Sequence, residues 1–184
     1  MNICVFCSAQ AVPDVYTDAA MEFGALLGKN GHTLLWGGTD RGLMKVVADA
    51  TQGNGGHLVG ISMELLKHKI RQNIDETTIA KTLGERKEIM LERSDAFIAF
   101  PGGIGTLDEI TEIIALKRHG THSKPILFLD TERFYEGVRA QLDRMNNEGF
   151  LGALDNDVVV GLDSLVYFAA TPGEAMRYIE DNGN

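Results

Sequence analysis

The residues best suited to bind an anion and act on it lie at 101–109, which read P-G-G-I-G-T-L-D-E. Gly102, Gly103 and Gly105 can adopt positive φ, and they carry no Cβ that would block a ligand. Their N–H groups would then face outward, and a helix that follows adds unpaired N–H groups and partial positive charge. Thr106 would lie at the helix start, where its hydroxyl can cap the helix or donate to an anion. The stretch therefore predicts a phosphate-binding turn.

The same stretch has a plainer interpretation as a strand-to-helix turn, in which Asp108 and Glu109 favour the helix dipole. Such a turn needs one glycine, and this one has three within four residues. Two other phosphate motifs are missing: no G-x-x-x-x-G-K-[ST] occurs, and the turn after the first apolar run reads C-S-A-Q-A-V-P-D (7–14), without G-x-G-x-x-G. A P-loop nucleotidase and a standard dinucleotide site are therefore disfavoured.

Two further segments can supply walls of the same site. The segment G-G-T-D-R-G-L-M (37–44) follows a second apolar run, and it is either a second wall of the pocket or a loop with a solvated Arg41. The segment G-E-R-K-E-I-M (84–90) carries Arg86 and Lys87, which would point about 100° apart on a helix. Only one of the two needs to face a pocket, and a solvated helix face also explains both.

The elements that would position these segments alternate along the chain. Apolar runs typical of strands lie at 3–8, 32–38, 57–62, 95–100, 125–130 and 164–170, and amphipathic stretches typical of helices lie at 14–29, 42–52, 84–94, 106–119, 133–147 and from 171 onward. Residues 63–82 predict a short helix, a loop and a strand. This alternation indicates βαβ units, and the continuous apolar strands indicate a sheet covered on both faces. We therefore predict a single Rossmann-like domain over residues 1–184, a doubly wound parallel α/β sheet with helices on both faces.

Composition narrows the classes of partner. The chain has 184 residues and a net charge of −9, with 44% hydrophobic and 23% charged residues. Such a negative field disfavours binding to nucleic acid. No apolar run reaches the roughly 18 residues of a membrane span, and the N-terminus M-N-I-C-V-F-C-S lacks the basic start of a signal peptide. We therefore expect no membrane partner and a cytoplasmic location.

Cysteine, histidine and tryptophan positions allow other chemistry without favouring it. Cys4 and Cys7 have C-x-x-C spacing, which can mark a redox pair or half of a zinc site. No second Cys or His cluster completes four ligands, and positions i and i+3 of a strand face opposite sides. His119 and His122 are only loosely paired, and Trp36 can stack on a base or pack in the core. We expect two buried cysteines, no metal and no cofactor.

The motif P-G-G-I-G-T-L-D-E matches P-G-G-x-G-T-x-x-E, the signature of the Lonely Guy (LOG) family of cytokinin riboside 5′-monophosphate phosphoribohydrolases, also described as lysine decarboxylases. Further segments resemble the family in the same order along nearly the whole chain: I-C-V-F-C-S (3–8), G-G-T-D-R-G-L-M-K-V-V-A-D-A (37–50), E-R-K (85–87) and G-T-H-S-K-P-I (120–126). The resemblance implies hydrolysis of the N-glycosidic bond of a nucleoside 5′-monophosphate, with free base and ribose 5-phosphate as products. It also implies a homodimer that needs no metal.

The resemblance further implies roles for individual residues. Arg86 and Glu109 would be the catalytic pair, with Glu109 stabilising positive charge on the sugar or activating water, and Arg86 binding substrate and favouring departure of the base. An arginine is a poor general acid, so the proton donor stays open. The implied phosphate- and substrate-binding residues are Gly102, Gly103, Gly105, Thr106, Lys87, Gly38, Gly42 and Met44.

The chain departs from the family pattern around the base. Leu83-Gly84 replace the family's Met-His, Ser62-Met63 replace Ile-Pro, and the acid-and-arginine pair has no counterpart in E-L-L-K-H-K-I-R-Q (64–72). The resemblance therefore implies the reaction more strongly than the cytokinin substrate. Two alternatives stay open: a hydrolase for pyrimidine or modified nucleotides, and a non-catalytic AMP-binding protein. Lysine decarboxylation is disfavoured, because it normally uses a pyridoxal Schiff-base lysine in a much larger chain.

Overall fold

The computed structural model describes residues 1–151 and 161–183. One seven-stranded sheet has the order β4-β3-β2-β1-β5-β6-β7, and all of its strand pairings are parallel. The strands are β1 (Asn2–Phe6), β2 (Thr33–Trp36), β3 (His57–Met63), β4 (Glu76–Ala80), β5 (Ala96–Ala99), β6 (Ile126–Leu129) and β7 (Tyr167–Ala169). The helices are α1 (Asp14–Lys29), α2 (Gly42–Gly53), α3 (Leu83–Arg93), α4 (Ile104–Arg118), α5 (Glu136–Asn147), α6 (Leu162–Leu165) and α7 (Pro172–Asn182), with 3₁₀ helices η1 (Glu64–Lys69) and η2 (Thr131–Arg133). The predicted doubly wound parallel α/β fold is confirmed.

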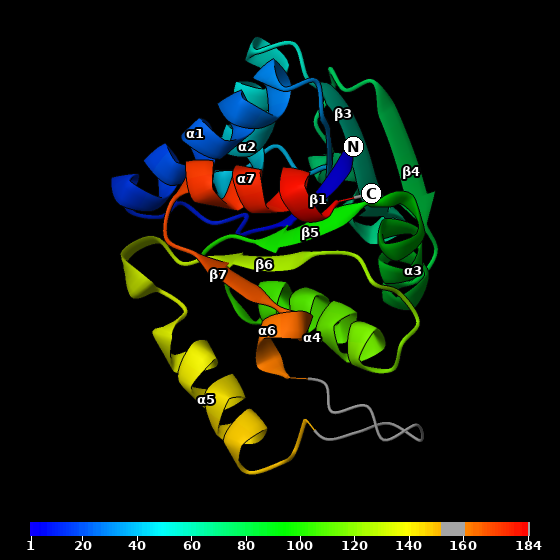
Figure 1. Cartoon of the computed structure of the whole chain (residues 1–184). Helices are drawn as coiled ribbons and strands as arrows, with labels where there is room; N and C mark the ends of the chain where they lie inside the picture. The colour runs from blue at the N-terminus through cyan, green and yellow to red at the C-terminus, as the bar shows by residue number, and fades with distance from the viewer. Residues whose placement is uncertain (152–160, 184) are drawn as a thin grey trace.

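Helices cover both faces of the sheet, as Figure 1 shows: α1, α2 and α7 lie on one face, and α3, α4, α5 and α6 lie on the other. Successive side chains of a strand alternate between the two faces. Because helices cover both faces, the strands are apolar on both of them. Ile3 and Val5 of β1 pack toward α1, α2 and α7, whereas Cys4 and Phe6 pack toward α3 and α4. Each face therefore has its own hydrophobic core.

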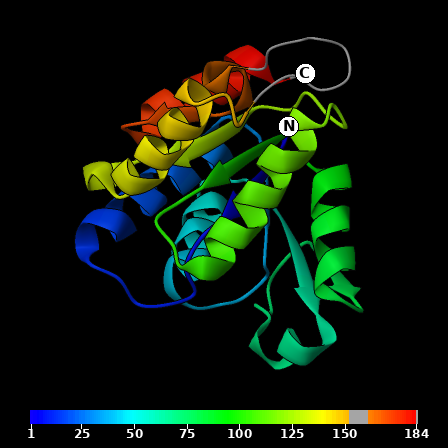
Figure 2. The same cartoon turned by 90° about the horizontal axis from the view of Figure 1, so that it is seen from below.

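The sheet has its topological switch point between β1 and β5. From β1 the chain builds outward through β2, β3 and β4, and it then crosses back to add β5, β6 and β7 on the other side. The loops that follow β1 and β5 diverge there, and a crevice forms at the carboxyl ends of the strands. Figure 2 shows that α3 and α4 lie next to each other on the same face of the sheet.

Several predicted element boundaries differ from the structure, and the differences are largest in meaning at two of them. The helix predicted at 106–119 begins two residues earlier, at Ile104, with Gly103 as its N-cap. The strand predicted at 164–170 is shorter, because residues 162–165 form the helical turn α6 before β7 begins at Tyr167. Leu162 and Leu165 are both buried, and a helical turn places residues three apart on one face. An apolar run thus served a helix and a strand in succession.

Candidate functional site

A cavity of about 320 Å³ opens at the carboxyl ends of β1, β2, β3 and β5. It therefore lies at the switch point of the sheet, the usual ligand position in doubly wound folds. The loops after these strands, together with η1, α3 and α4, supply its walls: Cys7, Ser8, Ala9, Gln10, Gly37, Thr39, Arg41, Met44, Leu66, Lys69, Arg86, Gly103, Gly105, Thr106 and Glu109.

A buried ion pair joins two helices at this cavity. Arg86 of α3 donates from Nη1 to Oε1 of Glu109 on α4 at 2.6 Å, and the two side chains are 8% and 10% exposed. The Nε of Arg86 also donates to the carbonyl oxygen of Ile61 in β3 at 2.9 Å. Thr82 caps α3 by accepting from the N–H of Glu85, so Arg86 lies in the first turn of a fixed helix. The hydrogen bonds to Glu109 and Ile61 and the capped first turn of α3 therefore fix the position of Arg86.

Burial gives Glu109 the character of a base. Loss of solvent raises the pKa of its carboxyl above the ordinary value of 4.5, although the positive charge of Arg86 acts in the opposite direction. A buried charge needs a partner, and Arg86 supplies one. The carboxylate is therefore more basic than an exposed one.

The glycine loop leaves room for an anion at the start of α4. Gly103 is the N-cap and provides no side-chain cap, so the first N–H groups of the helix have no intrahelical partner. A Cβ added to Gly103 or Gly105 would meet no protein atom within 4 Å. The hydroxyl of Thr106, which is buried, makes no hydrogen bond within residues 1–151 and 161–183. Free N–H groups, a free hydroxyl and open space together suit a phosphate.

The expected backbone of this loop is wrong in one respect, because none of its three glycines adopts positive φ. Gly105 belongs to the first turn of α4, and Gly103 has φ −91°. Thr106 is consequently the third residue of the helix and does not cap it. Gly102 does not line the cavity; a Cβ there would lie 2.2 Å from Oγ1 of Thr106, so this glycine lets the Thr106 side chain pack against the loop.

The loop after β2 forms another wall, and of the three residues predicted there, Gly38, Gly42 and Met44, only Met44 lines the cavity. Gly37 and Met44 line the cavity, and a Cβ on Gly37 would lie 2.7 Å from Nη2 of Arg86. Gly38 and Gly42 do not line it, but both adopt positive φ, 72° and 56°. A Cβ on Gly42 would approach the carbonyl carbon of Ala9 to 2.4 Å. These two glycines shape the loop and do not face the cavity.

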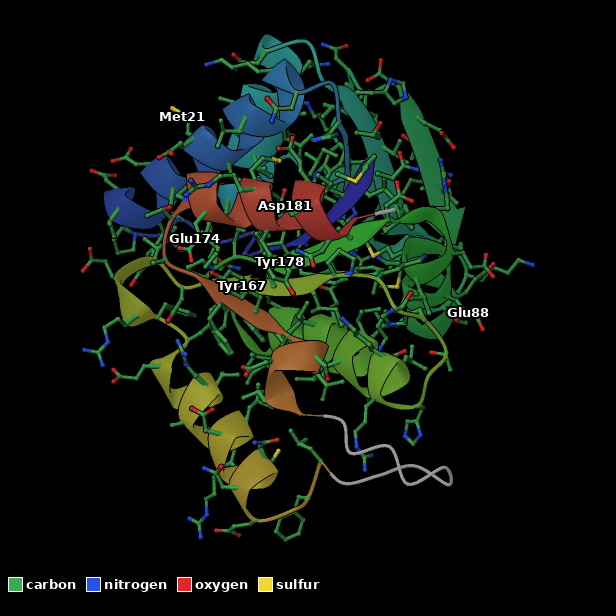
Figure 3. The ribbon with its side chains drawn as sticks, in the orientation of Figure 1. Met21, Glu88, Tyr167, Glu174, Tyr178 and Asp181 are labelled. Atoms are coloured by element: carbon green, nitrogen blue, oxygen red, sulfur yellow. The ribbon has the colours of Figure 1, made fainter. Side chains whose placement is uncertain are left out.

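Lys87 lies outside the cavity. Its ammonium pairs with Asp108 at 3.3 Å and also with Glu112, so it links α3 to α4. These carboxylates raise its pKa, chiefly through the hydrogen bond to Glu112. The next residue, Glu88, projects to solvent from α3 (Figure 3). Because Arg86 and Lys87 diverge on the helix, Arg86 faces the cavity while Lys87 braces the two helices that carry the ion pair.

The residues with alternative interpretations belong to the core. Trp36 is fully buried and packs on the face covered by α1, α2 and α7, so it does not reach a base in the cavity. Cys4 and Cys7 are free thiols buried on opposite faces of the sheet, as their spacing predicted. Burial raises the pKa of both. In the described part of the chain, no group of three or more His, Cys, Asp or Glu side chains is placed to hold a metal ion.

Sequence reasoning missed several cavity residues. Ser8 and Gln10 follow β1, Thr39 follows β2, and Leu66 and Lys69 come from η1. The position of the first three after apolar strands was a usable signal, since carboxyl ends of parallel strands share one edge. No comparable signal marked η1 as part of a site; it is the short helix predicted within residues 63–82.

The cavity thus combines a glycine loop, helix N–H groups without an intrahelical partner and a buried guanidinium–carboxylate pair, at the usual ligand position of a doubly wound sheet. Comparison with known proteins gives the family. The family model "Possible lysine decarboxylase" matches residues 44–170. The cytokinin riboside 5′-monophosphate phosphoribohydrolase of Mycobacterium tuberculosis is 35% identical over 166 residues, 89% of each chain. One of the same name from Arabidopsis thaliana is 36% identical over 166 residues, 89% of this chain and 78% of that protein. The chain belongs to this family, the LOG phosphoribohydrolases.

Solved structures agree with the fold. The Moco carrier protein of Chlamydomonas reinhardtii has a TM-score of 0.72 at 22% identity, covering 98% of this chain and 95% of that one. The molybdenum cofactor binding protein of Rippkaea orientalis has a TM-score of 0.70 at 22% identity, covering 98% and 94%. At this identity the likeness concerns the fold alone. Among the described helices, none combines the length and apolar character that crossing a bilayer requires.

Proposed function

We propose that this protein hydrolyses the N-glycosidic bond of a nucleoside 5′-monophosphate, either a cytokinin riboside 5′-monophosphate, as in the names of its relatives, or AMP. The products are the free base and ribose 5-phosphate. The observation that carries the proposal is the buried pair of Arg86 and Glu109 at 2.6 Å, in the wall of a cavity that also contains the glycine loop.

In this proposal the 5′-phosphate lies on the free N–H groups at the start of α4, beside Gly103, Gly105 and the Thr106 hydroxyl. Glu109 is three residues beyond Thr106 on the same helix, so both side chains lie on one face and both line the cavity. A phosphate held at the helix start therefore brings the ribose to the carboxylate. Gly102 supports the site by accommodating Thr106, and Lys87, Gly38 and Gly42 support it by fixing the surrounding elements.

The chemistry follows from charge. Breaking the bond from C1′ to the base develops positive charge on the sugar, as in other glycoside hydrolysis. The Glu109 carboxylate stabilises that charge and accepts a proton from the attacking water, a task that suits its raised pKa. Arg86 holds the carboxylate in place and lies within the same wall, where its guanidinium can hydrogen-bond the ribose or the base.

The two alternatives make different demands on the site. A non-catalytic AMP-binding protein has no use for a buried carboxylate beside a phosphate seat, because two anions repel each other and weaken binding. The position of Glu109 therefore favours catalysis. A hydrolase for pyrimidine or modified nucleotides would use the same pair, and it differs from the leading proposal only in the base.

The proposal extends to the whole chain and its setting. We take residues 1–184 as one nucleotide-binding domain, acting without a cofactor in the cytoplasm, as a homodimer. Large apolar side chains do lie at the surface: Met21 on α1, marked in Figure 3, is 52% exposed, Ile104 is 82% exposed and Leu65 is 79% exposed. They come from three different elements, and the homodimer is inferred from the family resemblance. Sedimentation of the purified protein tests the association.

A substrate panel tests the reaction. The protein is incubated with AMP, prenylated AMP, GMP, CMP and UMP, and free base and ribose 5-phosphate are followed by chromatography. Release of both products in equal amounts, abolished in Glu109→Gln, is the expected result. Binding of AMP without release of base from any member of the panel would favour the non-catalytic alternative.

A further inference from the structure

The cavity has a second end that the proposed reaction does not yet use. Leu66 and Lys69 line it from η1, which follows β3, whereas the glycine loop follows β5. In the order β3-β2-β1-β5 these strands are three spacings apart, or about 14 Å at ~4.8 Å per spacing. A nucleotide whose phosphate lies at the glycine loop and whose ribose lies at Glu109 would direct its base toward η1. The role of this end of the cavity given below rests on the proposed function.

This end of the cavity is fixed by a network of hydrogen bonds. The N–H of Asp40 donates to the carbonyl oxygen of Lys69 at 3.1 Å, and the N–H of Arg71 donates to the carbonyl oxygen of Gly38 at 2.9 Å. The Arg71 guanidinium is 11% exposed and pairs with Asp40 at 3.0 Å and with Asp49 at 2.6 Å. η1 is therefore fastened to the loop after β2 and to α2.

The 3₁₀ geometry of η1 aligns its two cavity residues. Such a helix has three residues per turn, so positions i and i+3 lie directly above one another. Leu66 and Lys69 have this spacing and both line the cavity, one apolar and one cationic. Lys69 has no ion-pair partner in the described part of the chain, whereas Lys67 on the same helix pairs with Glu64 at 3.4 Å. An unpaired ammonium can donate a hydrogen bond to the edge of a nucleobase, and an apolar side chain beside it can pack on the face of the ring.

We propose that Lys69 is the proton donor to the leaving base, acting at N7 of a purine while Leu66 packs on the ring. The other ionisable groups of the cavity are poorly suited to this role. A guanidinium such as that of Arg41 or Arg86 is a poor general acid, the Cys7 thiol is only 3% exposed at the cavity wall, and Glu109 is engaged with the attacking water. A lysine ammonium releases a proton more readily than an arginine guanidinium does.

Water attacks C1′ and gives one proton to the Glu109 carboxylate as the new C–O bond forms. The bond from C1′ to N9 breaks, and its electron pair stays on the base. The Lys69 ammonium transfers a proton to N7, so the base leaves as a neutral molecule. Glu109 then releases its proton to solvent and Lys69 takes one up, which leaves one water consumed per nucleotide.

Leaving-group dependence tests the assignment. Turnover of AMP is compared with turnover of 4-nitrophenyl riboside 5-phosphate, whose leaving group departs without protonation, in the wild type and in Lys69→Met. We expect the variant to lose about 100-fold in kcat for AMP, within the range of general acid catalysis, and less than about 3-fold for the nitrophenyl substrate. Lys67→Met, which removes an exposed lysine outside the cavity, serves as the matched control.

A second substrate identifies the atom. 7-deaza-AMP has carbon in place of N7, so the wild type should hydrolyse it about as slowly as Lys69→Met hydrolyses AMP, and the variant should lose no more with it. Equal losses on AMP and the nitrophenyl substrate would overturn the proposal, since a structural or phosphate-binding role affects both alike. Unchanged AMP turnover in Lys69→Met would overturn it while leaving the proposed function intact. Inactivity of the wild type toward both substrates would instead overturn the proposed function, and this assignment with it.

Discussion

Two glycine-rich loops lie at the same edge of the sheet, and their glycines serve different purposes. After β2, Gly38 and Gly42 adopt positive φ, and a Cβ on Gly42 would collide with the backbone of Ala9. After β5, Gly103 and Gly105 avoid positive φ, and a Cβ on either would enter open space. One loop uses glycine to fit the chain against itself, and the other uses it to leave a volume that no protein atom fills.

A cluster of glycines therefore does not by itself locate a ligand. Both loops follow a buried strand and open a helix, so they look equivalent in the sequence. The helices that follow them differ in what they deliver: α4 brings the buried carboxylate of Glu109 to the cavity, while α2 brings the apolar side chain of Met44. We therefore expect substitutions in the β5 loop and α4 to affect the reaction, and substitutions in the β2 loop to affect stability.

Glu109→Gln should have the largest effect. The amide keeps the shape of the side chain but neither stabilises positive charge nor accepts the proton of water, so kcat for the nucleotide should fall about 10³-fold. Asp108→Asn is the matched control, because Asp108 lies next in sequence but is exposed and pairs with Lys87 outside the cavity. It should keep kcat within about 3-fold. Comparable losses in the two variants would contradict the role given to Glu109.

Gly42→Ala should cost the most stability. The substitution places a Cβ 2.4 Å from the carbonyl carbon of Ala9 in a residue with φ 56°. Left-handed backbone and overpacking together should lower the free energy of unfolding by about 3 kcal/mol. Urea denaturation followed by circular dichroism measures this loss. Gly53→Ala, at a helical position with open space around the added Cβ, is the control and should be neutral or slightly stabilising.

Gly103→Val should show the opposite behaviour. The added Cβ meets no protein atom within 4 Å, and the backbone φ of −91° is accessible to any residue. The free energy of unfolding should therefore change by less than about 1 kcal/mol. The side chain would occupy the space proposed for the phosphate, so KM for the nucleotide should rise about 10-fold or more. Unchanged KM in a folded variant would show that the phosphate lies elsewhere.

More of the fold than of the candidate site could be predicted from the sequence. The strands and helices were predictable because each is a continuous pattern, and α1 occupies the predicted 14–29. Arg86 and Glu109 were identifiable only through resemblance to a family, since their hydrogen bond joins residues 23 apart on different helices. Lys69 was not identifiable, because η1 reaches the cavity through contacts of Arg71 with Asp40 and Asp49, 31 and 22 residues away. Local pattern does not encode contacts at such separations.

The pH dependence of the reaction tests whether Glu109, on the β5 side of the cavity, is the general base. Burial raises the pKa of Glu109 above 4.5, and the charge of Arg86 opposes this. The carboxylate must be ionised to accept a proton, so kcat/KM should fall as the pH drops through the raised pKa. A pH profile of kcat/KM for the nucleotide, with activity rechecked at neutral pH, should place the acid limb above 4.5. A limb at or below that value would assign it to another group.

The smallest effect is expected at the inner wall of the cavity, where Cys7 lies between the two loops. Cys7 is 3% exposed and Cys4 is fully buried, and both are free thiols whose pKa is raised by burial. A thiolate is the reactive form, so neither should react with Ellman's reagent in the folded protein, and both should react at once in guanidinium chloride. Equal slow kinetics with and without AMP would show that this wall stays closed whether or not the cavity is filled. Rapid reaction of Cys7 that AMP suppresses would mean that the open space of the cavity extends beyond the glycine loop to the wall after β1. The contrast between a packed wall and an open one would then be wrong.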